Sequence, residues 1–322
     1  MPISSRFSWL VGFALLVAFQ AIAQDFPRKS ITIVASSPPG GGVDLITRIL
    51  ARALSEEWKQ TVVVENRSGA GGIVGTQYVA NAQPDGYTLL TVSLGHATNP
   101  SLYQKMPYDT MAEFTPLSLL AKLTVALTVN KSLPVNSVKE LIAYAKANPE
   151  KLSCGSGGNG SSQHLACEMF KNLAGLKILH IPYRGVGAAR TDLIGGQIQI
   201  MFDQISFAAQ NVQSGNVKVL AVTTMKRSPL IPNIPTMDEA GLAGYDVVTW
   251  FGLLGPSNLP RNVIEKLRID LPRIMAKPEI RKELEKQTFD SVFSGPSEFD
   301  LFLKQEMIKW DKVIKEAGIQ PS

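Results

Sequence analysis

The residues best suited to binding chemistry form a glycine- and serine-rich stretch, Gly155-Ser156-Gly157-Gly158-Asn159-Gly160-Ser161-Ser162-Gln163-His164. The stretch follows a short strand-like segment and opens a segment whose apolar residues have helical spacing. Glycines let the backbone turn sharply and approach a ligand, and Ser161 or Ser162 is a favourable N-cap. Free N–H groups at the positive end of a helix favour an anion. The stretch therefore predicts an anion-binding loop.

A second loop of this kind lies upstream, where Pro38-Pro39-Gly40-Gly41-Gly42 separates a strand-like segment, residues 31–37, from a helical one, residues 43–59. Two such loops in one chain predict a ligand held from two sides. The first half-site would comprise Gly41, Gly42 and Asp44, unless Asp44 only caps its own helix. The second would comprise Ser161, Ser162 and His164, and its alternative is simple N-capping.

Further candidates lie where other segments end. Tyr183, Arg184 and Gly185 end the next strand at the same sheet edge, where open α/β sheets bind ligands. Arg184 could pair with a ligand carboxylate, or with one of the acidic side chains nearby in the sequence, Asp192 and Asp203. Additional candidates are His96, Asn99 and Asp203, the last of which is better suited to a water or a ligand amine than to an anion.

The chain lacks the residues that several kinds of catalysis require. Gly155-x-Gly157-x-x-Gly160 matches a dinucleotide fingerprint, but the next strand ends at Tyr183-Arg184 instead of an acid. No Walker lysine follows a glycine loop, and no G-x-S-x-G elbow occurs. Ser162 and His164 are too close in sequence to form a relay alone. The three histidines have no metal-ligand spacing. We therefore expect neither a cofactor nor a metal, and no enzyme, with an exported hydrolase as a distant alternative.

The N-terminal segment indicates the compartment. Residues 1–23 combine one positive charge, an apolar core and Ala21-Ile22-Ala23, the pattern of a signal peptide with cleavage near Ala23. We expect an exported, periplasmic protein. The net charge of +5 comes without a lysine or arginine block, so nucleic acid is not an expected partner.

Only two cysteines occur, Cys154 and Cys167. In an oxidising compartment they could pair, but two independent small core residues is the favoured interpretation.

The chain alternates strand-like and helical segments twice, which predicts a mainly parallel α/β sheet in each of two domains. His96 and Asn99 are expected in a loop, residues 123–129 in a strand and residues 237–241 in a short helix. Three C-terminal helical segments are expected to pack on the first domain.

The whole pattern resembles the Bug-type periplasmic solute-binding proteins of the tripartite tricarboxylate transporter family. The matching residues run through the chain in order: Ile31-Thr32-Ile33-Val34, Pro38 to Asp44, Val62 to Arg67, Gly69 to Gly72, Pro84 to Leu90, Asn99-Pro100, Leu102-Tyr103, Gly155 to Ala166, Pro182 to Gly185, Asp192-Leu193, Gly195 to Gln197, Met201 to Asp203, Arg227 to Pro229, Pro235-Thr236 and Glu239 to Gly241. Two departures are Ser36-Ser37, where the family often has Pro-Phe, and Cys154, where an aromatic residue is common.

The resemblance implies a two-lobe fold of two α/β domains joined by two crossing strands, with the ligand cleft between them. The expected lobes are residues 24–123 with 249–322, and residues 124–248. It also implies capture of an organic carboxylate, delivery to integral-membrane permease subunits, and a monomer. The same fold presenting its ligand to a membrane sensor kinase is the alternative, and the sequence does not name the acid.

Overall fold

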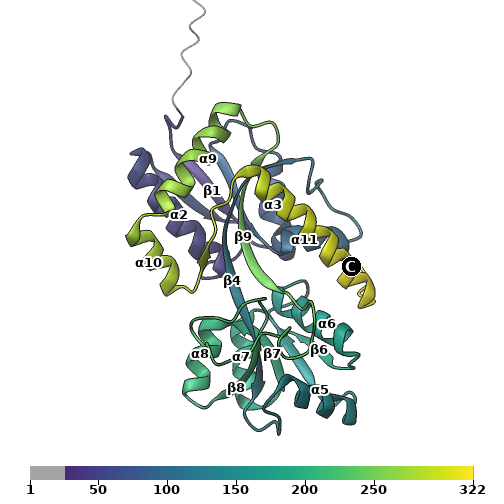
Figure 1. Ribbon diagram of the computed structural model, residues 1–322. Coiled ribbons are helices and arrows are strands. Elements are labelled where there is room, and N and C mark those ends of the chain that lie inside the picture. Colours follow the sequence, from purple (N-terminus) through teal and green to yellow (C-terminus); the bar gives the residue numbers. More distant parts are fainter. Residues whose placement is uncertain (1–25, 322) are drawn as a thin grey trace, which may run out of the picture.

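The computed structural model describes residues 26–321, which form two lobes that share one ten-stranded sheet (Figure 1). The predicted signal peptide and its cleavage site lie outside the described residues. Within the described residues no helix is long and apolar enough to cross a membrane.

The first lobe contains the parallel strands β2 (Val62–Asn66), β1 (Ile31–Ala35) and β3 (Thr88–Ser93), in that order. Helices α2 (Gly42–Trp58), α3 (Ile73–Ala80) and α4 (Gly95–Leu102) follow the three strands of this lobe, α2 after β1, α3 after β2 and α4 after β3. A short 3-10 helix, η1 (Ala70–Gly72), precedes α3. Because the strands are parallel, their carboxyl ends and the helix N-termini meet at one edge of the sheet.

Two long strands connect the lobes. β4 (Phe114–Asn130) pairs antiparallel with β9 (Val248–Pro256) from Phe114 to Thr124, and from Val125 to Asn130 it pairs with strands of the second lobe. β4 therefore belongs to both lobes, and Figure 1 shows it running between them beside β9. The predicted strand at residues 123–129 is the C-terminal part of a longer one. The predicted division of the chain into domains stays a prediction.

The second lobe contains β7 (Ile200–Gln204), β5 (Ser153–Ser156), β6 (Leu179–Pro182) and β8 (Val217–Val222). Its helices are α5 (Val138–Ala147), α6 (Ser162–Ala174), α7 (Val186–Gly195) and α8 (Ile205–Gln213). β5 pairs parallel with both β6 and β7, so this lobe repeats the strand-to-helix edge of the first.

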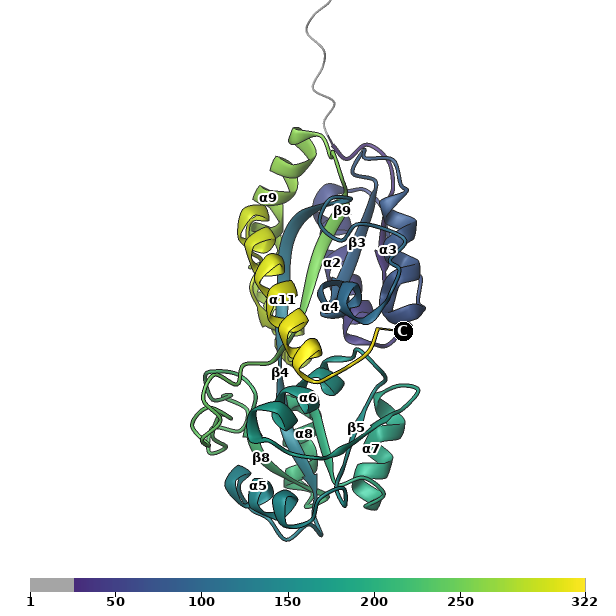
Figure 2. The ribbon, with the colours of Figure 1, turned by 90° about the vertical axis from the view of Figure 1, so that its right-hand side faces the viewer.

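The C-terminal segment returns to the first lobe as α9 (Arg261–Met275), α10 (Pro278–Lys286), the short β10 (Asp290–Ser291) and α11 (Pro296–Glu316). α11 packs on β4 and α4 and reaches α6 of the second lobe (Figure 2). The buried Glu306 accepts hydrogen bonds from the indole N–H groups of Trp250 on β9 and Trp310, both at 2.9 Å. The last helix is thereby fixed to a crossing strand.

Two local predictions are wrong. His96 and Asn99 lie in α4 instead of a loop, and the short helix continues through Pro100. Residues 237–241 form turns, in which Glu239 accepts a hydrogen bond from the Thr236 N–H at 2.9 Å. The predicted helices over the C-terminal segment match α9, α10 and α11 closely.

Candidate functional site

A cleft of about 550 Å³ lies between the two lobes, at the edge where strands end and helices begin. We call it the main cleft. Its lining residues are Ser36, Ser37, Pro38, Ser68, Gly69, Ala70, Gly71, Gly72, Ser93, Leu94, Gly95, Asn99, Gly157, Asn159, Gly160, Ser161, Ser162, Gln163 and Thr249. The volume falls in the range of small-molecule sites.

The first lobe contributes the N-termini of α3 and α4. Gly71 and Gly72 have φ values of 63° and 96°, a backbone region that favours glycine. Asn99 donates from Nδ2 to the Gly71 carbonyl oxygen at 3.2 Å, and a Cβ on Gly95 would lie 2.8 Å from the same oxygen. These close approaches require glycine and fix the loop 69–72 against α4.

The second lobe contributes the loop 157–161 and the N-terminus of α6. Ser161 caps α6, because its Oγ accepts the His164 N–H at 3.3 Å. A Cβ on Gly160 would lie 2.7 Å from Cδ1 of Leu102 in the first lobe. The loop therefore touches the opposite lobe, and glycine is needed there for the lobes to approach.

The electrostatics of the main cleft come from the backbone. Its lining residues carry no ionisable side chain. None of α3, α4 and α6 has an acidic residue in its first turn. The same holds for α7, α8 and α9, whereas α2, α5, α10 and α11 each have one. Three positive helix ends without their own counter-charge meet at one cleft, an arrangement that favours an anion without a cationic side chain.

The first predicted half-site lies elsewhere. Gly41 and Gly42 line a separate cavity of about 230 Å³ between the lobes, together with Arg190 of the second lobe and the exposed Lys286. Asp44 is buried beside this loop and is not part of either lining.

The Asp44 carboxylate is occupied within its own loop. It accepts hydrogen bonds from Gly40 N at 2.9 Å, Asn66 Nδ2 at 2.8 Å and Arg48 Nε at 3.0 Å. Burial alone would raise the pKa of Asp44, but these hydrogen bonds hold it below its ordinary value. Asp44 thus binds the loop that precedes α2, whose N-cap, Gly41, has no side-chain capping hydrogen bond. Ligand contact by Asp44 stays a prediction.

Two predicted histidines lie behind the walls of the main cleft. The His96 ring packs edge-on against Phe114, with centroids 5.3 Å apart, and burial lowers its pKa to about 4. His164 is 5% exposed and lies beneath the loop 157–161, where its Nδ1 accepts the Gly160 N–H at 3.1 Å. Asn99, Ser161 and Ser162 are the predicted residues that the structure brings together in the main cleft.

The remaining predicted residues are outside the main cleft. Tyr183 donates to Asp192 at 2.7 Å, and burial together with this hydrogen bond raises its pKa to about 12. Asp203 is fully buried and accepts from Arg190 at 2.6 and 2.8 Å. Burial raises the pKa of Asp203, and the Arg190 contacts oppose that rise.

Arg184 is exposed, and it pairs with neither of the two acids named as its alternatives. Gly185, with φ of 107°, precedes α7 as its N-cap.

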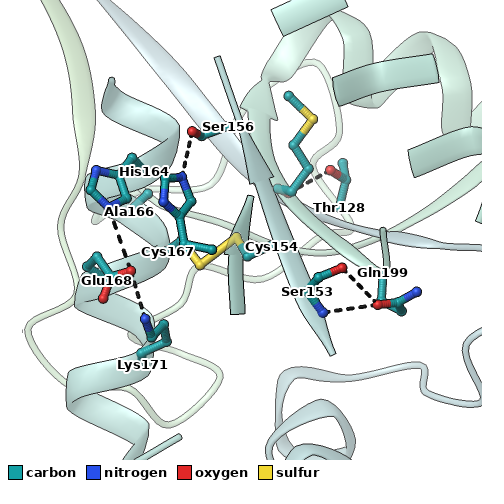
Figure 3. The surroundings of a disulfide bond; sticks show 12 residues. Thr128, Ser153, Cys154, Ser156, His164, Ala166, Cys167, Glu168, Lys171 and Gln199 are labelled. Carbon is teal, nitrogen blue, oxygen red and sulfur yellow. Dashed lines mark hydrogen bonds and ion pairs between the residues drawn. A yellow bond between two sulfur atoms is a disulfide. The ribbon is translucent and has the colours of Figure 1, made fainter. Parts of the chain in front are cut away.

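The favoured interpretation of the cysteines is wrong, because Cys154 and Cys167 form a disulfide with a Cα–Cα distance of 6.6 Å (Figure 3). Cys154 lies on β5 and Cys167 on α6, so the bond joins the two elements that flank the loop 157–161. Their separation of 13 residues allows pairing only because strand and helix fold back on each other.

Several residues of the main cleft were not predicted, namely Ser68, Gly69, Ala70, Gly71, Gly72, Ser93, Leu94, Gly95 and Thr249. Two signals could have indicated most of them. Gly69-Ala70-Gly71-Gly72 is a third glycine-rich segment that opens a helix, and Ser93 ends a strand at the same sheet edge. Thr249 lies on a crossing strand, and no local signal marks it.

Two lobes, two crossing strands and a cleft between them define the solute-binding class of protein. A family model described as the tripartite tricarboxylate transporter family receptor matches residues 46–319. The chain belongs to this family.

Relatives of known sequence span nearly the whole chain. A UPF0065 protein in the tcbD-tcbE intergenic region of Pseudomonas sp. (strain P51) is 38% identical over 292 residues, covering 90% of this chain and 87% of the relative. Protein BugT of Bordetella pertussis is 32% identical over 304 residues, covering 94% and 93%. The predicted Bug-type membership is therefore confirmed.

Solved structures confirm the two-lobe fold. Rpa4515 of R. palustris with adipate has a TM-score of 0.83 at 33% identity, and the match covers 92% of this chain and all of that one. The periplasmic binding protein BugD has a TM-score of 0.80 at 35% identity, covering 92% and 100%. MatC of Rhodopseudomonas palustris with bound malate has a TM-score of 0.79 at 29% identity, covering 90% and 100%.

Proposed function

We propose that this protein captures a small organic acid in the main cleft, from the class of dicarboxylates, tricarboxylates and aromatic acids. The observation that carries the proposal is the meeting of three helix N-termini, each without an acidic first turn, at a cleft with no ionisable side chain in its lining. Backbone N–H groups and serine hydroxyls would bind a carboxylate there. The adipate and malate held by two similar proteins support this ligand class.

In this proposal the ligand contacts come from both lobes. Asn99 and the loop 69–72 would bind one end of the acid, and Ser161 with Ser162 the other. The lobes would close over the ligand by rotation about β4 and β9, because the contacts from the second lobe form only when the lobes meet.

We further propose delivery of the acid to the permease subunits of a tripartite tricarboxylate transporter, without catalysis, after export to the periplasm and removal of residues 1–23. The family description supports this partner, and BugD supports the compartment.

A thermal-shift panel tests the ligand class. Adipate, malate, citrate and benzoate would be compared with their amides and with neutral sugars. A ligand at about 100 times its Kd adds about 2.7 kcal/mol of stability, so an acid should raise Tm by several degrees while its amide does not. A shift from a sugar, with none from any acid, would contradict the proposal.

A further inference from the structure

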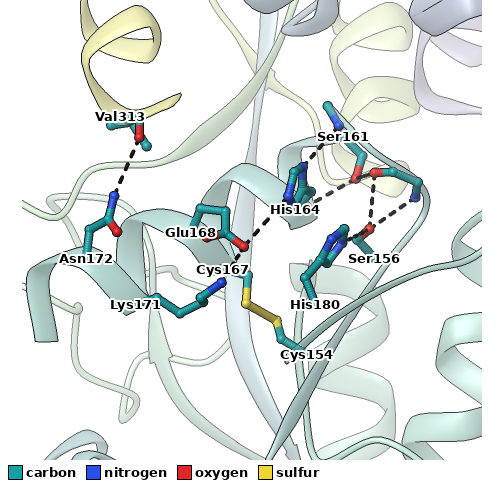
Figure 4. A network of polar contacts seen from close by, with 12 residues as sticks. Cys154, Ser156, Ser161, His164, Cys167, Glu168, Lys171, Asn172, His180 and Val313 are labelled. Atoms are coloured by element: carbon teal, nitrogen blue, oxygen red, sulfur yellow. Dashed lines mark hydrogen bonds and ion pairs between the residues drawn. A yellow bond between two sulfur atoms is a disulfide. The ribbon is translucent and has the colours of Figure 1, made fainter. Parts of the chain in front are cut away.

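Two histidine rings lie directly behind the loop 157–161, outside the lining of the main cleft (Figure 4). The rings of His164 on α6 and His180 on β6 stack with centroids 3.9 Å apart and planes at 20°. The disulfide between Cys154 and Cys167 lies beside them. Since neither ring is part of the cleft lining, any effect on a ligand must pass through the loop.

Each ring supports one glycine N–H of the loop. His164 Nδ1 accepts the Gly160 N–H at 3.1 Å. His180 Nε2 lies 2.7 Å from Ser156 Oγ, and this oxygen accepts the Gly158 N–H at 3.1 Å. The first contact is direct, and the second passes through one hydroxyl.

The loop has one backbone hydrogen bond of its own, from the Ser161 N–H to the Gly158 carbonyl oxygen at 3.2 Å, and Ser161 Oγ donates to the same oxygen at 2.7 Å. The two histidine contacts add support at the N–H groups of Gly158 and Gly160. Gly158 and Gly160 have φ values of 130° and 74°, and glycine is free to leave such conformations. With these two N–H groups bonded from behind, the N–H groups of Asn159, Ser162 and Gln163 have no protein acceptor among the described residues. These are the donors that face a ligand in the proposed site.

We infer that His164 and His180 are positioning residues, two neutral imidazoles that orient the loop 157–161 for a carboxylate. The inference rests on the proposed function for its ligand, but the support of the loop does not depend on it. Protonation of Nδ1 would turn the acceptor of the Gly160 N–H into a donor.

The surroundings favour the neutral rings. On α6, Glu168 Oε1 lies 3.7 Å from His164 Nε2, and Lys171 holds the same carboxylate at 2.7 Å. Burial first, and then the positive Lys171, lower the pKa of His164 to about 4. The pKa of His180 falls to about 3, chiefly by burial, with His164 and Lys171 adding to the effect.

Amide side chains provide matched tests, because asparagine places its oxygen near the position of Nδ1 and glutamine near that of Nε2. His164→Asn keeps the acceptor for Gly160, whereas His164→Gln moves it. The preference reverses at the other ring, where His180→Gln keeps the contact with Ser156 and His180→Asn loses it. All four variants remove a ring, so the loss of stacking is the same within each pair.

Calorimetric titration at pH 7.5 with the acid that gives the largest thermal shift is the first measurement. We expect His164→Gln and His180→Asn to weaken binding tenfold or more, and His164→Asn and His180→Gln to stay within about threefold of the parent. Equal affinity within each pair, whether retained or lost, would overturn the positioning role.

The second measurement is hydrogen exchange of the Gly158 and Gly160 amides, followed by NMR without ligand. We expect protection of the Gly160 amide in the parent and in His164→Asn, and its loss in His164→Gln. Unchanged protection in His164→Gln would overturn the inference even if no acid binds. Protected amides without binding of any acid would instead contradict only the proposed function.

Discussion

The two glycine loops predicted from the sequence differ in how their helix N-termini are neutralised. At the loop Gly40–Gly42, the Asp44 carboxylate of the following helix accepts the Gly40 N–H and pairs with Arg48. At the loop 157–161 the helix begins with serines and has no acid in its first turn. A positive helix end that carries its own carboxylate has less attraction left for a ligand. If the loop 157–161 binds the acid as proposed, the missing acidic residue distinguishes it from the first loop as much as its glycines do.

The pH dependence of stability should separate the two regions most strongly. Two histidines with lowered pKa values lie behind the second loop and none behind the first. A folded pKa below the unfolded value of about 6.5 means that the unfolded chain binds more protons, so stability falls as pH falls from about 6.5 toward 4. Each such histidine contributes up to about 1.4 kcal/mol per pH unit, less for the partly exposed His180.

Urea unfolding at pH 7, 6 and 5 measures this slope. The double variant His164→Asn with His180→Gln should lose about half or more of the acid sensitivity of the parent, and His96→Asn only about a third. Carboxylates titrate alike in all three proteins and drop out of the difference. An unchanged slope in the double variant would show that these rings are accessible to protons in the folded state.

An acid placed at the second loop should make it resemble the first. Ser162→Asp puts a carboxylate at the start of α6, where it lies in the main cleft. Like charges about 4 Å apart repel by about 4 kcal/mol at an effective dielectric constant of 20, so binding of the acid should weaken at least 100-fold.

The free energy of unfolding should stay equal or rise slightly, since an acid is favourable at a helix N-terminus. Ser162→Asn is the neutral control of the same size as the aspartate, and it should weaken binding far less than Ser162→Asp does. If the aspartate variant binds the acid normally by calorimetry, the helix end is not the anion site.

The disulfide is another feature that only the second loop has. It closes a segment of 14 residues around that loop, and a closed segment of this length contributes about 3 kcal/mol. Replacing both Cys154 and Cys167 by serine should lower the free energy of unfolding by about 2 to 4 kcal/mol. Urea unfolding checks this, with each single variant as control. A loss below about 0.5 kcal/mol would show that strand and helix hold the loop without the bond.

The local patterns of the sequence predicted the alternating elements and the sheet edge that carries the site. Apolar spacing and serine caps are encoded within a few residues, so α6 and its loop were predicted correctly. The residues that contact each loop are distant from it in the sequence. The stacking of His164 on His180 depends on the pairing of β5 with β6, and the lobe contact at Gly160 depends on a helix some 60 residues upstream.

The sequence also did not predict which candidate ligand-binding side chains pair with other side chains of the protein. Asp203 looked free to bind a ligand amine, but Arg190, one helix earlier, takes both carboxylate oxygens. The pairing of Arg190 with Asp203 follows from the packing of α7 on β7, and the spacing of these residues in the sequence does not predict it.

The smallest expected effect comes from removing the acid of the first loop. Asp44→Asn keeps the shape of the side chain and one acceptor for the Gly40 N–H, but it loses the charge that pairs with Arg48. Because Arg48 is half exposed, the pair is partly screened, and we expect a loss of about 1 kcal/mol at pH 7. Because the pKa of Asp44 in the folded protein lies below its unfolded value near 3.9, this stability is fully present above about pH 4 and is lost as the pH falls further. The parent and the variant should therefore converge below about pH 4.

Affinity of Asp44→Asn for the acid should change less than threefold, since Asp44 does not line the main cleft. Calorimetry beside urea unfolding separates the two effects, with Arg48→Gln as the control that breaks the same pair from its other side. A tenfold change in affinity for Asp44→Asn would place the first loop in the ligand site and reverse the contrast between the two loops.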